Sequence, residues 1–364
     1  MGLKLAIVGL PNVGKSTLFN AVAQTAAAQA ANYPFCTIEP NLAEVDVPDP
    51  RLAVLARLAG SPRIVPARLE IVDVAGLVRG ASKGEGLGNQ FLGHIRDCDA
   101  LAIVARCFED PDIAHVEGRI DPLNDLETVE TELMLADLES LERRLPAWEK
   151  RSRSDKETAE AMRLARVALA ELEGGRPARS ARVAAEDQRA WRQLQLLTAK
   201  PALYVANVEE GAAAAGNDLS AKVEQRGAVV GAETLVISAK IESEVAQLAE
   251  IERPEMLALL GLAESGLERL IRSAFSLLGL ITFFTAGPKE ARAWTIAAGA
   301  RAPQAAGVIH GDFERGFIRA ETIAFDDFQR LGGETAAKEA GRMRSEGKDY
   351  VVRDGDVMNF RFNV

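Results

Sequence analysis

One short motif near the start of the chain limits the possible folds more than any other feature. Residues 9–16 read GLPNVGKS and fit the pattern G-x-x-x-x-G-K-S. The motif follows the apolar run 4–8 and precedes the helix-like segment 17–22. In this context, glycines let backbone N–H groups turn inward around a phosphate, and the helix N-terminus adds positive potential. The sequence therefore predicts an α/β domain with a phosphate-binding loop, or P-loop.

The predicted P-loop assigns a role to most of its residues. Lys15 is expected to neutralise the β- and γ-phosphates of a nucleotide, and Ser16 is expected to bind Mg²⁺. Further contacts to the nucleotide are expected from Asn12, Val13, Gly14 and Thr17. A chance match is the alternative, and the position of the motif at the end of the first predicted strand argues against it.

Two further segments supply candidate switch residues. Asp73 follows the apolar run 69–72, where P-loop enzymes hold Mg²⁺ through water, and Gly76 would bring its N–H to the γ-phosphate. Thr37 lies before the second predicted strand, where a threonine ligates Mg²⁺ and senses the γ-phosphate. An ordinary turn or loop residue is the alternative in each case. The predicted catalytic residues are Lys15, Thr37 and Gly76, and the predicted metal ligands are Ser16, Thr37 and Asp73.

The residues expected at the nucleobase depart from the guanine-binding pattern. GTP-binding proteins of this architecture carry N-K-x-D after a late strand, whereas this chain has NVEE at 207–210. Val208 replaces the lysine that stacks on the base, and Glu210 replaces the aspartate that accepts two bonds from guanine. Such a shift penalises guanine more than adenine, whose amine Asn207 would bind, so the segment favours ATP over GTP. The residues expected to close the base pocket are Ser238, Ala239 and Lys240.

Hydrophobic patterning divides the rest of the chain. Short continuous apolar runs predict strands buried on both faces of a mainly parallel sheet. These runs occupy 3–9, 69–74, 101–107, 202–207 and 234–238, and the alternating segment 41–47 predicts an edge strand. Residues 278–364 combine apolar runs at 280–284, 316–318 and 357–362 with turn signals, which predicts a small mixed α+β domain.

Residues 126–200 show a helical pattern instead. Leu138, Leu141, Leu145 and Trp148 form one stripe, and Met162, Ala165, Leu169 and Leu172 form a second. Trp191, Leu194 and Leu197 predict a third helix. We interpret the region as a helical hairpin or coiled-coil arm inserted into the α/β domain. Ordinary core helices of one larger domain are the alternative.

Composition limits the compartment and the partners. The formal net charge of −10 excludes a uniformly basic nucleic-acid-binding protein. The surplus acid lies in residues 1–125 (−4) and 201–277 (−6), whereas 126–200 and 278–364 are neutral. Three cysteines argue for a reducing compartment, and no apolar stretch is long enough to span a bilayer, so we expect a cytoplasmic protein without membrane contact.

Two basic clusters are candidate RNA contacts, with a solvated mixed-charge surface as the alternative. On the arm they are Arg143, Arg144, Lys150, Arg151 and Arg153, and near the end of the chain Arg342, Arg344 and Lys348.

Seven segments together resemble the YchF family, the Obg-like ATPases of the translation-factor-related P-loop class. They are GLPNVGKST, PFCTIEPN, DVAGLV, KGEGLGNQFL, RCFED, NVEE and ISAKIESE, in this order along the chain. The resemblance covers essentially the whole chain, and its last segment looks like a TGS domain, a β-grasp module. It implies a P-loop domain at 1–125 and 201–277, the inserted arm at 126–200 and the TGS domain at 278–364.

The resemblance also implies an activity. Members of the family hydrolyse ATP in preference to GTP, bind ribosomes, and are linked to translation and stress responses. We therefore expect a ribosome-associated ATPase switch, a monomer that contacts the large subunit and RNA through the arm and the TGS domain. Mg²⁺ is the expected cofactor. Asn12 resembles the asparagine that holds K⁺ in related cation-dependent enzymes, which makes K⁺ a second candidate.

Two other functions stay open at this point. A GTP-dependent RNA-binding regulator would use nucleotide binding, with hydrolysis incidental. A small-molecule kinase would use the same P-loop but would need an acceptor pocket and lid arginines, and the two switch-like loops argue against it.

Overall fold

The computed structural model describes residues 3–30, 41–74, 87–112 and 119–363. The chain divides into two compact units. The first unit comprises Met1–Val45 and Glu70–Leu270, and the second comprises Asp46–Leu69 and Ile271–Val364. No helix in the described ranges is long and apolar enough to cross a membrane.

The first sheet confirms the predicted α/β class. Its strand order is β2-β4-β1-β5-β6-β7, and the pairs from β4 to β7 are all parallel. The strands are β1 Lys4–Val8, β2 Leu42–Asp46, β4 Arg68–Asp73, β5 Ala100–Cys107, β6 Ala202–Val208 and β7 Thr234–Ile237. Every residue of β5 and β6 is buried, which explains their continuous apolar runs. The alternating strand β2 lies at the sheet edge, as predicted.

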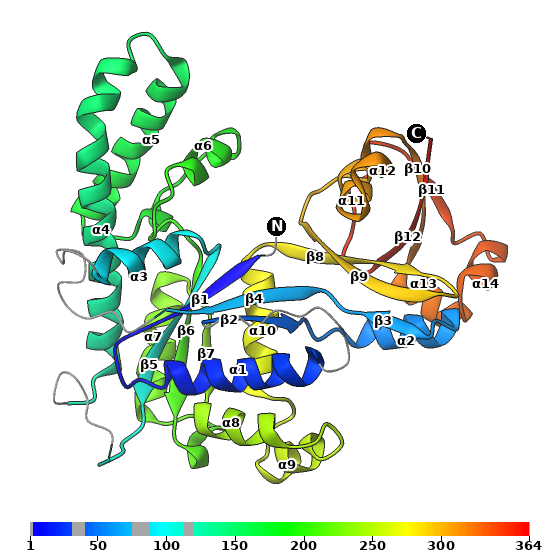
Figure 1. Cartoon of the computed structure of the whole chain (residues 1–364), viewed down its shortest axis with the longest axis horizontal. Helices are drawn as coiled ribbons and strands as arrows, with labels where there is room; N and C mark the ends of the chain where they lie inside the picture. The colour runs from blue at the N-terminus through cyan, green and yellow to red at the C-terminus, as the bar shows by residue number, and fades with distance from the viewer. Residues whose placement is uncertain (1–2, 31–40, 75–86, 113–118, 364) are drawn as a thin grey trace. The chain divides into compact units, whose positions relative to one another are not determined.

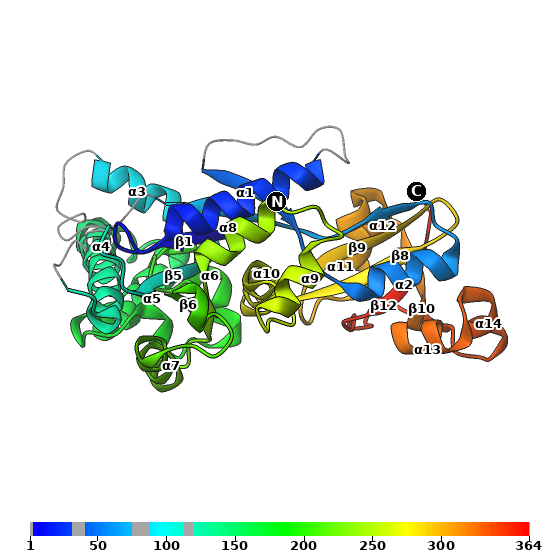
Figure 2. The same cartoon turned by 90° about the horizontal axis from the view of Figure 1, so that it is seen from below.

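Helices lie on both sides of this sheet, and Figure 2 shows α1 and α7 on opposite sides of the strands. The helices that belong wholly to the first unit are α1 Lys15–Ala30, α3 Leu87–Arg96, α4 Pro122–Arg151, α5 Lys156–Glu173, α6 Gln188–Gln193, α7 Asp218–Val230, α8 Ala239–Gln247 and α9 Arg253–Leu259. The helix α10 Gly266–Leu277 begins in this unit. Short 3₁₀ turns lie between α5 and α7, at Ala178–Ser180, Ala185–Asp187 and Glu210–Ala212.

The predicted helical insert is present as a hairpin of α4 and α5, which run side by side (Figure 1). Asp121 caps α4 by accepting a hydrogen bond from the Asn124 N–H at 3.2 Å. The first half of α4 packs against β5, whereas its second half contributes to a separate small core with α5 and α6. Buried members of this core are Leu141, Leu164, Ala165, Ala168, Leu172, Trp191 and Leu194.

The third predicted helix of the insert is shorter than its apolar stripe suggests. The helix α6 ends at Gln193, because the chain turns at Gln195, which has a positive φ of 53°. Leu194 and Leu197 therefore lie beyond the helix, although both are buried as the stripe predicted.

The second unit contains a mixed sheet in the order β11-β10-β12-β8-β9-β3. A β8–β9 hairpin precedes the helix α11, and β12 then pairs in parallel with β8 in the middle of the sheet, which is the β-grasp arrangement. The strands are β3 Arg63–Val65, β8 Leu280–Ala286, β9 Glu290–Ala297, β10 Phe317–Ala324, β11 Arg344–Glu346 and β12 Asp356–Phe362. The helices are α2 Pro50–Ala59, α11 Ala302–Ile309, α12 Gly311–Arg315, α13 Phe325–Leu331 and α14 Glu334–Glu339. Phe283 lies in its core and meets Phe360 edge to face at 5.9 Å.

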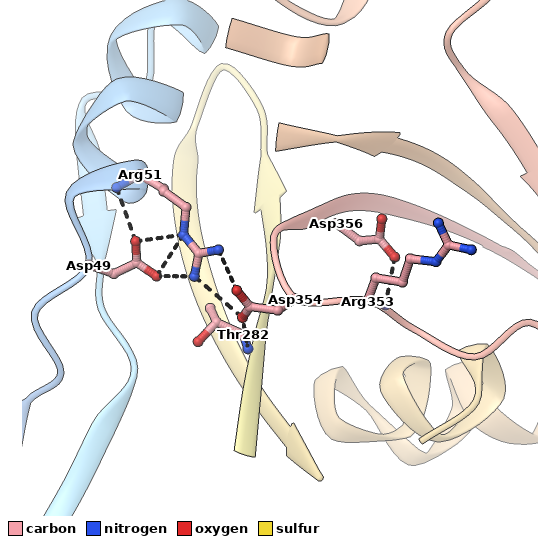
Figure 3. Close-up of polar contacts among 6 residues, drawn as sticks. All are labelled: Asp49, Arg51, Thr282, Arg353, Asp354 and Asp356. Atoms are coloured by element: carbon pink, nitrogen blue, oxygen red, sulfur yellow. Dashed lines mark hydrogen bonds and ion pairs between the residues drawn. The ribbon is translucent and has the colours of Figure 1, made fainter. Parts of the chain in front are cut away.

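The predicted boundaries did not anticipate that α2 and β3 belong to this second unit. The sequence placed residues 46–69 in the nucleotide domain, but they pack with the C-terminal residues, and β3 pairs in parallel with β9. Figure 3 shows the polar anchor. The Arg51 guanidinium donates to Asp49 at 2.7 Å and to Asp354 at 2.6 Å, and Asp354 also accepts the Thr282 N–H at 2.9 Å.

This polar anchor helps to explain why residues 46–69 belong to the second unit and not, as predicted, to the nucleotide domain. The Arg51 guanidinium also lies 5.1 Å from the centre of the Phe284 ring. The Arg51–Asp354 bond joins positions 303 residues apart, so no local pattern in the sequence indicates it.

Candidate nucleotide-binding site

A cavity of about 600 Å³ lies at the carboxyl ends of the strands of the first sheet. This edge is where open parallel sheets bind ligands. The lining residues that the sequence predicted are Asn12, Gly14, Lys15, Ser16, Thr17, Asn207, Val208, Glu210, Ser238, Ala239 and Lys240. The structure therefore brings together three predicted segments that are far apart in the chain, residues 12–17, 207–210 and 238–240. Of the predicted nucleotide ligands, Val13 alone is not among the lining residues, since its side chain is fully buried.

Backbone geometry shapes the phosphate end of the cavity. Gly14 has a φ of +98°, and a Cβ atom there would lie 2.1 Å from the Asn207 amide nitrogen. Any side chain would therefore displace Asn207, which explains why the motif requires glycine at this position. Asn12 also has a positive φ, 64°, a conformation that asparagine tolerates better than most residues.

Lys15 is the buried cation of the phosphate end. Its side chain is only 5% exposed, and its ammonium group donates to the Leu10 carbonyl oxygen at 2.6 Å. Burial lowers the pKa of Lys15 to about 8, and the nearby Asp73 carboxylate acts in the opposite direction. The P-loop thus holds a cation whose charge is weakly compensated, which suits an anionic ligand.

Asp73 ends β4 with an incomplete set of contacts. Its Oδ1 atom is buried and has no hydrogen-bond partner within the described part of the chain. Burial raises the pKa of Asp73, and Lys15 lowers it. A buried carboxylate oxygen without a donor and the Ser16 hydroxyl at the cavity are the hard oxygen ligands that Mg²⁺ prefers, so these two residues fit the cation.

The remaining predicted catalytic and metal residues, Thr37 and Gly76, lie outside the described residues. Among the described residues, no group of three or more His, Cys, Asp or Glu side chains forms a metal site. A magnesium ion bound mainly by one carboxylate, hydroxyls, phosphates and water needs no such group.

Asn207, which was expected to bind the adenine amine, also makes hydrogen bonds within the protein at both atoms of its amide. The side-chain nitrogen donates to the Val13 carbonyl at 2.9 Å, and the side-chain oxygen accepts the Ala239 N–H at 2.9 Å. Asn207 is 4% exposed. It therefore joins the P-loop to the segment that closes the base end of the cavity.

The other predicted base residues lie at the cavity, with unequal exposure. Val208 is buried, whereas Glu210 and Lys240 are exposed and form an ion pair at 2.9 Å. Ser238 is buried, and its hydroxyl has no partner among the residues described.

Sequence reasoning missed one wall of the cavity. Phe108, Glu109 and Asp110 line it directly after β5, and Glu209 lines it after β6. Asn217 links these two strand ends, because its side-chain nitrogen donates to the Cys107 carbonyl at 2.6 Å and to the Glu209 carboxylate at 2.9 Å. The position of residues 108–110 at the end of a central parallel strand was the signal that would have found them.

Two of the basic residues considered as RNA contacts are engaged within the protein. Arg144 donates to the Ser140 and Leu194 carbonyls and lies over the Trp148 ring. Arg344 bonds to the Tyr350 hydroxyl at 3.0 Å. Both guanidinium groups therefore hold local structure.

Two family models match the chain. The first, MMR_HSR1, is described as "50S ribosome-binding GTPase" and matches residues 4–144. The second, YchF-GTPase_C, is described as "Protein of unknown function (DUF933)" and matches residues 280–363.

Several curated proteins are similar over the full length of the chain. "Ribosome-binding ATPase YchF" of Bacillus subtilis is 52% identical over 367 residues, which cover 100% of both chains. The protein of the same name from Escherichia coli O157:H7 is 52% identical over 365 residues, again covering 100% of both. "Obg-like ATPase 1" of Oryza sativa is 44% identical and covers 100% of this chain and 92% of the rice protein.

Solved structures agree with this relationship. The Schizosaccharomyces pombe "YchF GTPase" superposes with a TM-score of 0.88 at 36% identity, and the match covers 99% of this chain and 98% of the other. A "GTP binding protein" from Pyrococcus horikoshii has a TM-score of 0.61 at 19% identity, with 99% and 100% of the two chains covered. The second similarity concerns the fold alone.

Proposed function

The chain belongs to the YchF family, and from this premise we propose that it is a ribosome-binding ATPase that hydrolyses ATP in preference to GTP. In this proposal, hydrolysis switches the protein between two conformations during translation and stress responses. The single observation that supports the proposal best is the cavity that joins the P-loop to a base end without the guanine-binding N-K-x-D residues.

The base end supports adenine. Lysine and aspartate of the guanine pattern are replaced by the buried Val208 and by Glu210, whose carboxylate is paired with Lys240. A base site whose carboxylate is longer by one methylene and paired with another side chain loses the discrimination that a well-placed acceptor for guanine provides. The similar proteins carry both words in their names, ATPase and GTPase, so nucleotide preference is the property to measure first.

The phosphate end suggests how these residues promote hydrolysis. Lys15 would leave the Leu10 carbonyl and neutralise charge on the β- and γ-phosphates. Ser16 and Asp73 would hold Mg²⁺, with Thr37 and Gly76 as the remaining predicted ligands of the cation and the γ-phosphate. When bound, Mg²⁺ neutralises charge that develops on the phosphate oxygens.

A second cation is also proposed. Asn12 lies at the cavity and would hold K⁺ near the phosphates, where it would supply positive charge. Hydrolysis is expected to be faster in a potassium buffer than in a sodium buffer of equal ionic strength. Equal rates in the two buffers would remove K⁺ from the proposal.

The test of nucleotide preference is a pair of binding titrations with ATP and GTP. Wild-type protein is expected to bind ATP more tightly. The Val208→Lys, Glu210→Asp double variant rebuilds N-K-x-D and is expected to shift the preference toward GTP, while Glu224→Asp, on the exposed side of α7, serves as the control. GTP binding to the wild type as tight as ATP binding would contradict the proposal.

Ribosome binding requires a separate measurement. Co-sedimentation with ribosomes and with isolated large subunits, in the presence of ATP, ADP or no nucleotide, is expected to show binding that depends on the nucleotide. The description "50S ribosome-binding GTPase" of the matching model supports the large subunit as the partner. Equal co-sedimentation in all three states would argue against a nucleotide-controlled switch.

A further inference from the structure

Arg106 is the largest fully buried charged side chain among the described residues. It is 1% exposed and lies next to the end of β5, in register with Asn207 on β6. A buried guanidinium is costly unless hydrogen bonds satisfy its donors. The contacts that it makes therefore indicate what the charge is retained for.

Several contacts of Arg106 are directed at the cavity wall. Its Nε donates to the Phe108 carbonyl at 3.1 Å, and one terminal nitrogen donates to the Asp110 carbonyl at 3.2 Å. The guanidinium carbon also lies 4.5 Å from the centre of the Phe108 ring. Phe108, Glu109 and Asp110 line the cavity, whereas Arg106 is buried behind them.

We propose that Arg106 is a positioning residue that fixes the wall formed by Phe108, Glu109 and Asp110, and thereby sets how tightly the site holds a nucleobase. The proposal rests on the proposed function to the extent that the cavity binds a nucleotide. The wall comes from a different part of the chain than the P-loop, because it directly follows β5. Asn207, the register partner of Arg106 on β6, is the first residue of the NVEE segment.

Arginine suits this task better than any other cation. Its planar fork donates in two directions at once, so it can hold the carbonyls of residues 108 and 110 together while its flat face lies on an aromatic ring. A lysine has one compact donor group and cannot reproduce this geometry. A wall that is fixed before binding reduces the entropic cost of ordering the site when the ligand binds.

The test separates the base from the phosphates. Dissociation constants for ATP and for inorganic tripolyphosphate, which has no base, are measured on the full chain for the wild type, Arg106→Leu and Arg106→Lys. Arg106→Leu is expected to raise the dissociation constant for ATP by about tenfold or more, which corresponds to the loss of one hydrogen bond from a charged donor. Tripolyphosphate binding and kcat at saturating ATP are expected to stay within about twofold, while KM rises with the ATP dissociation constant.

A matched control tests whether general damage explains the result. Arg179 is also largely buried and holds Glu130, away from the lining residues. Arg179→Leu is expected to lower the melting temperature without changing the ratio of the two dissociation constants. Arg106→Lys is expected to fall between the wild type and Arg106→Leu, and it remains informative if the leucine variant does not fold.

Two outcomes would overturn the role of Arg106. One is equal weakening of ATP and tripolyphosphate, and the other is ATP binding that does not change in either variant. The ratio is taken with whichever of ATP or GTP binds the wild type more tightly. A preference for GTP would therefore overturn the proposed function and leave the test of Arg106 intact.

Discussion

The two ends of the nucleotide cavity are built by different means. The phosphate end comes from one continuous loop, residues 9–16, whose backbone conformation is set by the loop itself. The base end comes from three separated segments, 108–110, 207–210 and 238–240. Three side chains hold these segments in place, namely the buried Arg106 and Asn207 and the half-buried Asn217.

This difference separates what each end can recognise. A backbone loop with one cation binds phosphates regardless of the base attached to them. An assembled wall depends on each of its links, so it responds to the size and shape of the base. Changes at the phosphate end should therefore affect all nucleotides alike, and changes at the base end should affect them selectively.

The largest effect is expected from Lys15→Ala. Because the Lys15 ammonium group is the side-chain cation expected to neutralise the transferred phosphate, its loss is expected to lower kcat by about 10² to 10³. ATP, GTP and tripolyphosphate should all bind more weakly, by similar factors. Hydrolysis assays and competition titrations measure the two effects, with the exposed Lys222→Ala on α7 as the control. Loss of ATP binding alone would break the proposed division between the two ends.

The same difference explains what the sequence could predict. Each strand of the first sheet has a local signal, an apolar run or, for β2, an alternating pattern, and the P-loop has a local motif, so both were found. In the predicted α+β domain, the apolar runs at 280–284, 316–318 and 357–362 overlap the strands β8, β10 and β12. Local patterns fail where a contact joins distant positions, as with Arg51 and Asp354, which move residues 46–69 into the second unit.

At the site, the sequence predicted which segments line the cavity better than it predicted the contacts between them. The bonds of the Asn207 amide to Val13 and Ala239 were not anticipated. The wall at 108–110 was missed although its position after a central strand could have indicated it, and its hydrogen bonds to the buried Arg106 left no local pattern. Side-chain hydrogen bonds between segments are not visible as spacing or periodicity, so only the folded chain reveals them.

The second largest effect is expected from Asn207→Ala. This change removes two buried hydrogen bonds and leaves the Val13 carbonyl and the Ala239 N–H unpaired. Since Asn207 joins both ends, ATP and tripolyphosphate should both weaken, by about ten- to hundredfold, and the melting temperature should fall. Calorimetric titration and thermal unfolding measure these changes.

Asn217→Ala is the matched comparison, because Asn217 links Cys107 to Glu209 at the base end. Asn217→Ala should weaken the binding of ATP but leave the binding of tripolyphosphate nearly unchanged. If Asn207→Ala also spares tripolyphosphate, then Asn207 belongs to the base end alone and the bridge between the ends has no energetic importance.

An intermediate effect is expected from pH. Burial lowers the pKa of Lys15 to about 8, so its charge is lost as the pH rises through that value. Between pH 7 and pH 9 the charged fraction falls from about nine tenths to about one tenth, and nucleotide affinity should weaken by about tenfold. At the base end, the hydrogen bond from Lys240 to Glu210 raises the pKa of Lys240, so that cation keeps its charge over this range.

Isothermal titration at several pH values, in buffers of different ionisation enthalpy, measures both the affinity and the protons taken up on binding. The wild type should take up protons when it binds ATP near pH 8.5, because this pH lies above the Lys15 pKa of about 8 and most of the free protein then carries an uncharged Lys15. Lys15→Ala should bind weakly with little dependence on pH over the same range. Equal wild-type affinity at pH 7 and pH 9 would show that the charge of Lys15 is not what the phosphates recognise.

The smallest effect is expected from Lys240→Ala. Lys240 and Glu210 were predicted as nucleotide ligands, but their side chains are 69% and 44% exposed and they pair with each other. Exposed ion pairs contribute little and are screened by salt, so ATP affinity should change by less than about fivefold and the change should disappear in 0.5 M salt, about the range where screening is strong. A loss of tenfold or more that persists at high salt would mean that Lys240 contacts the nucleotide directly. The base end would then contain a cation of its own, and charge would no longer distinguish it from the phosphate end.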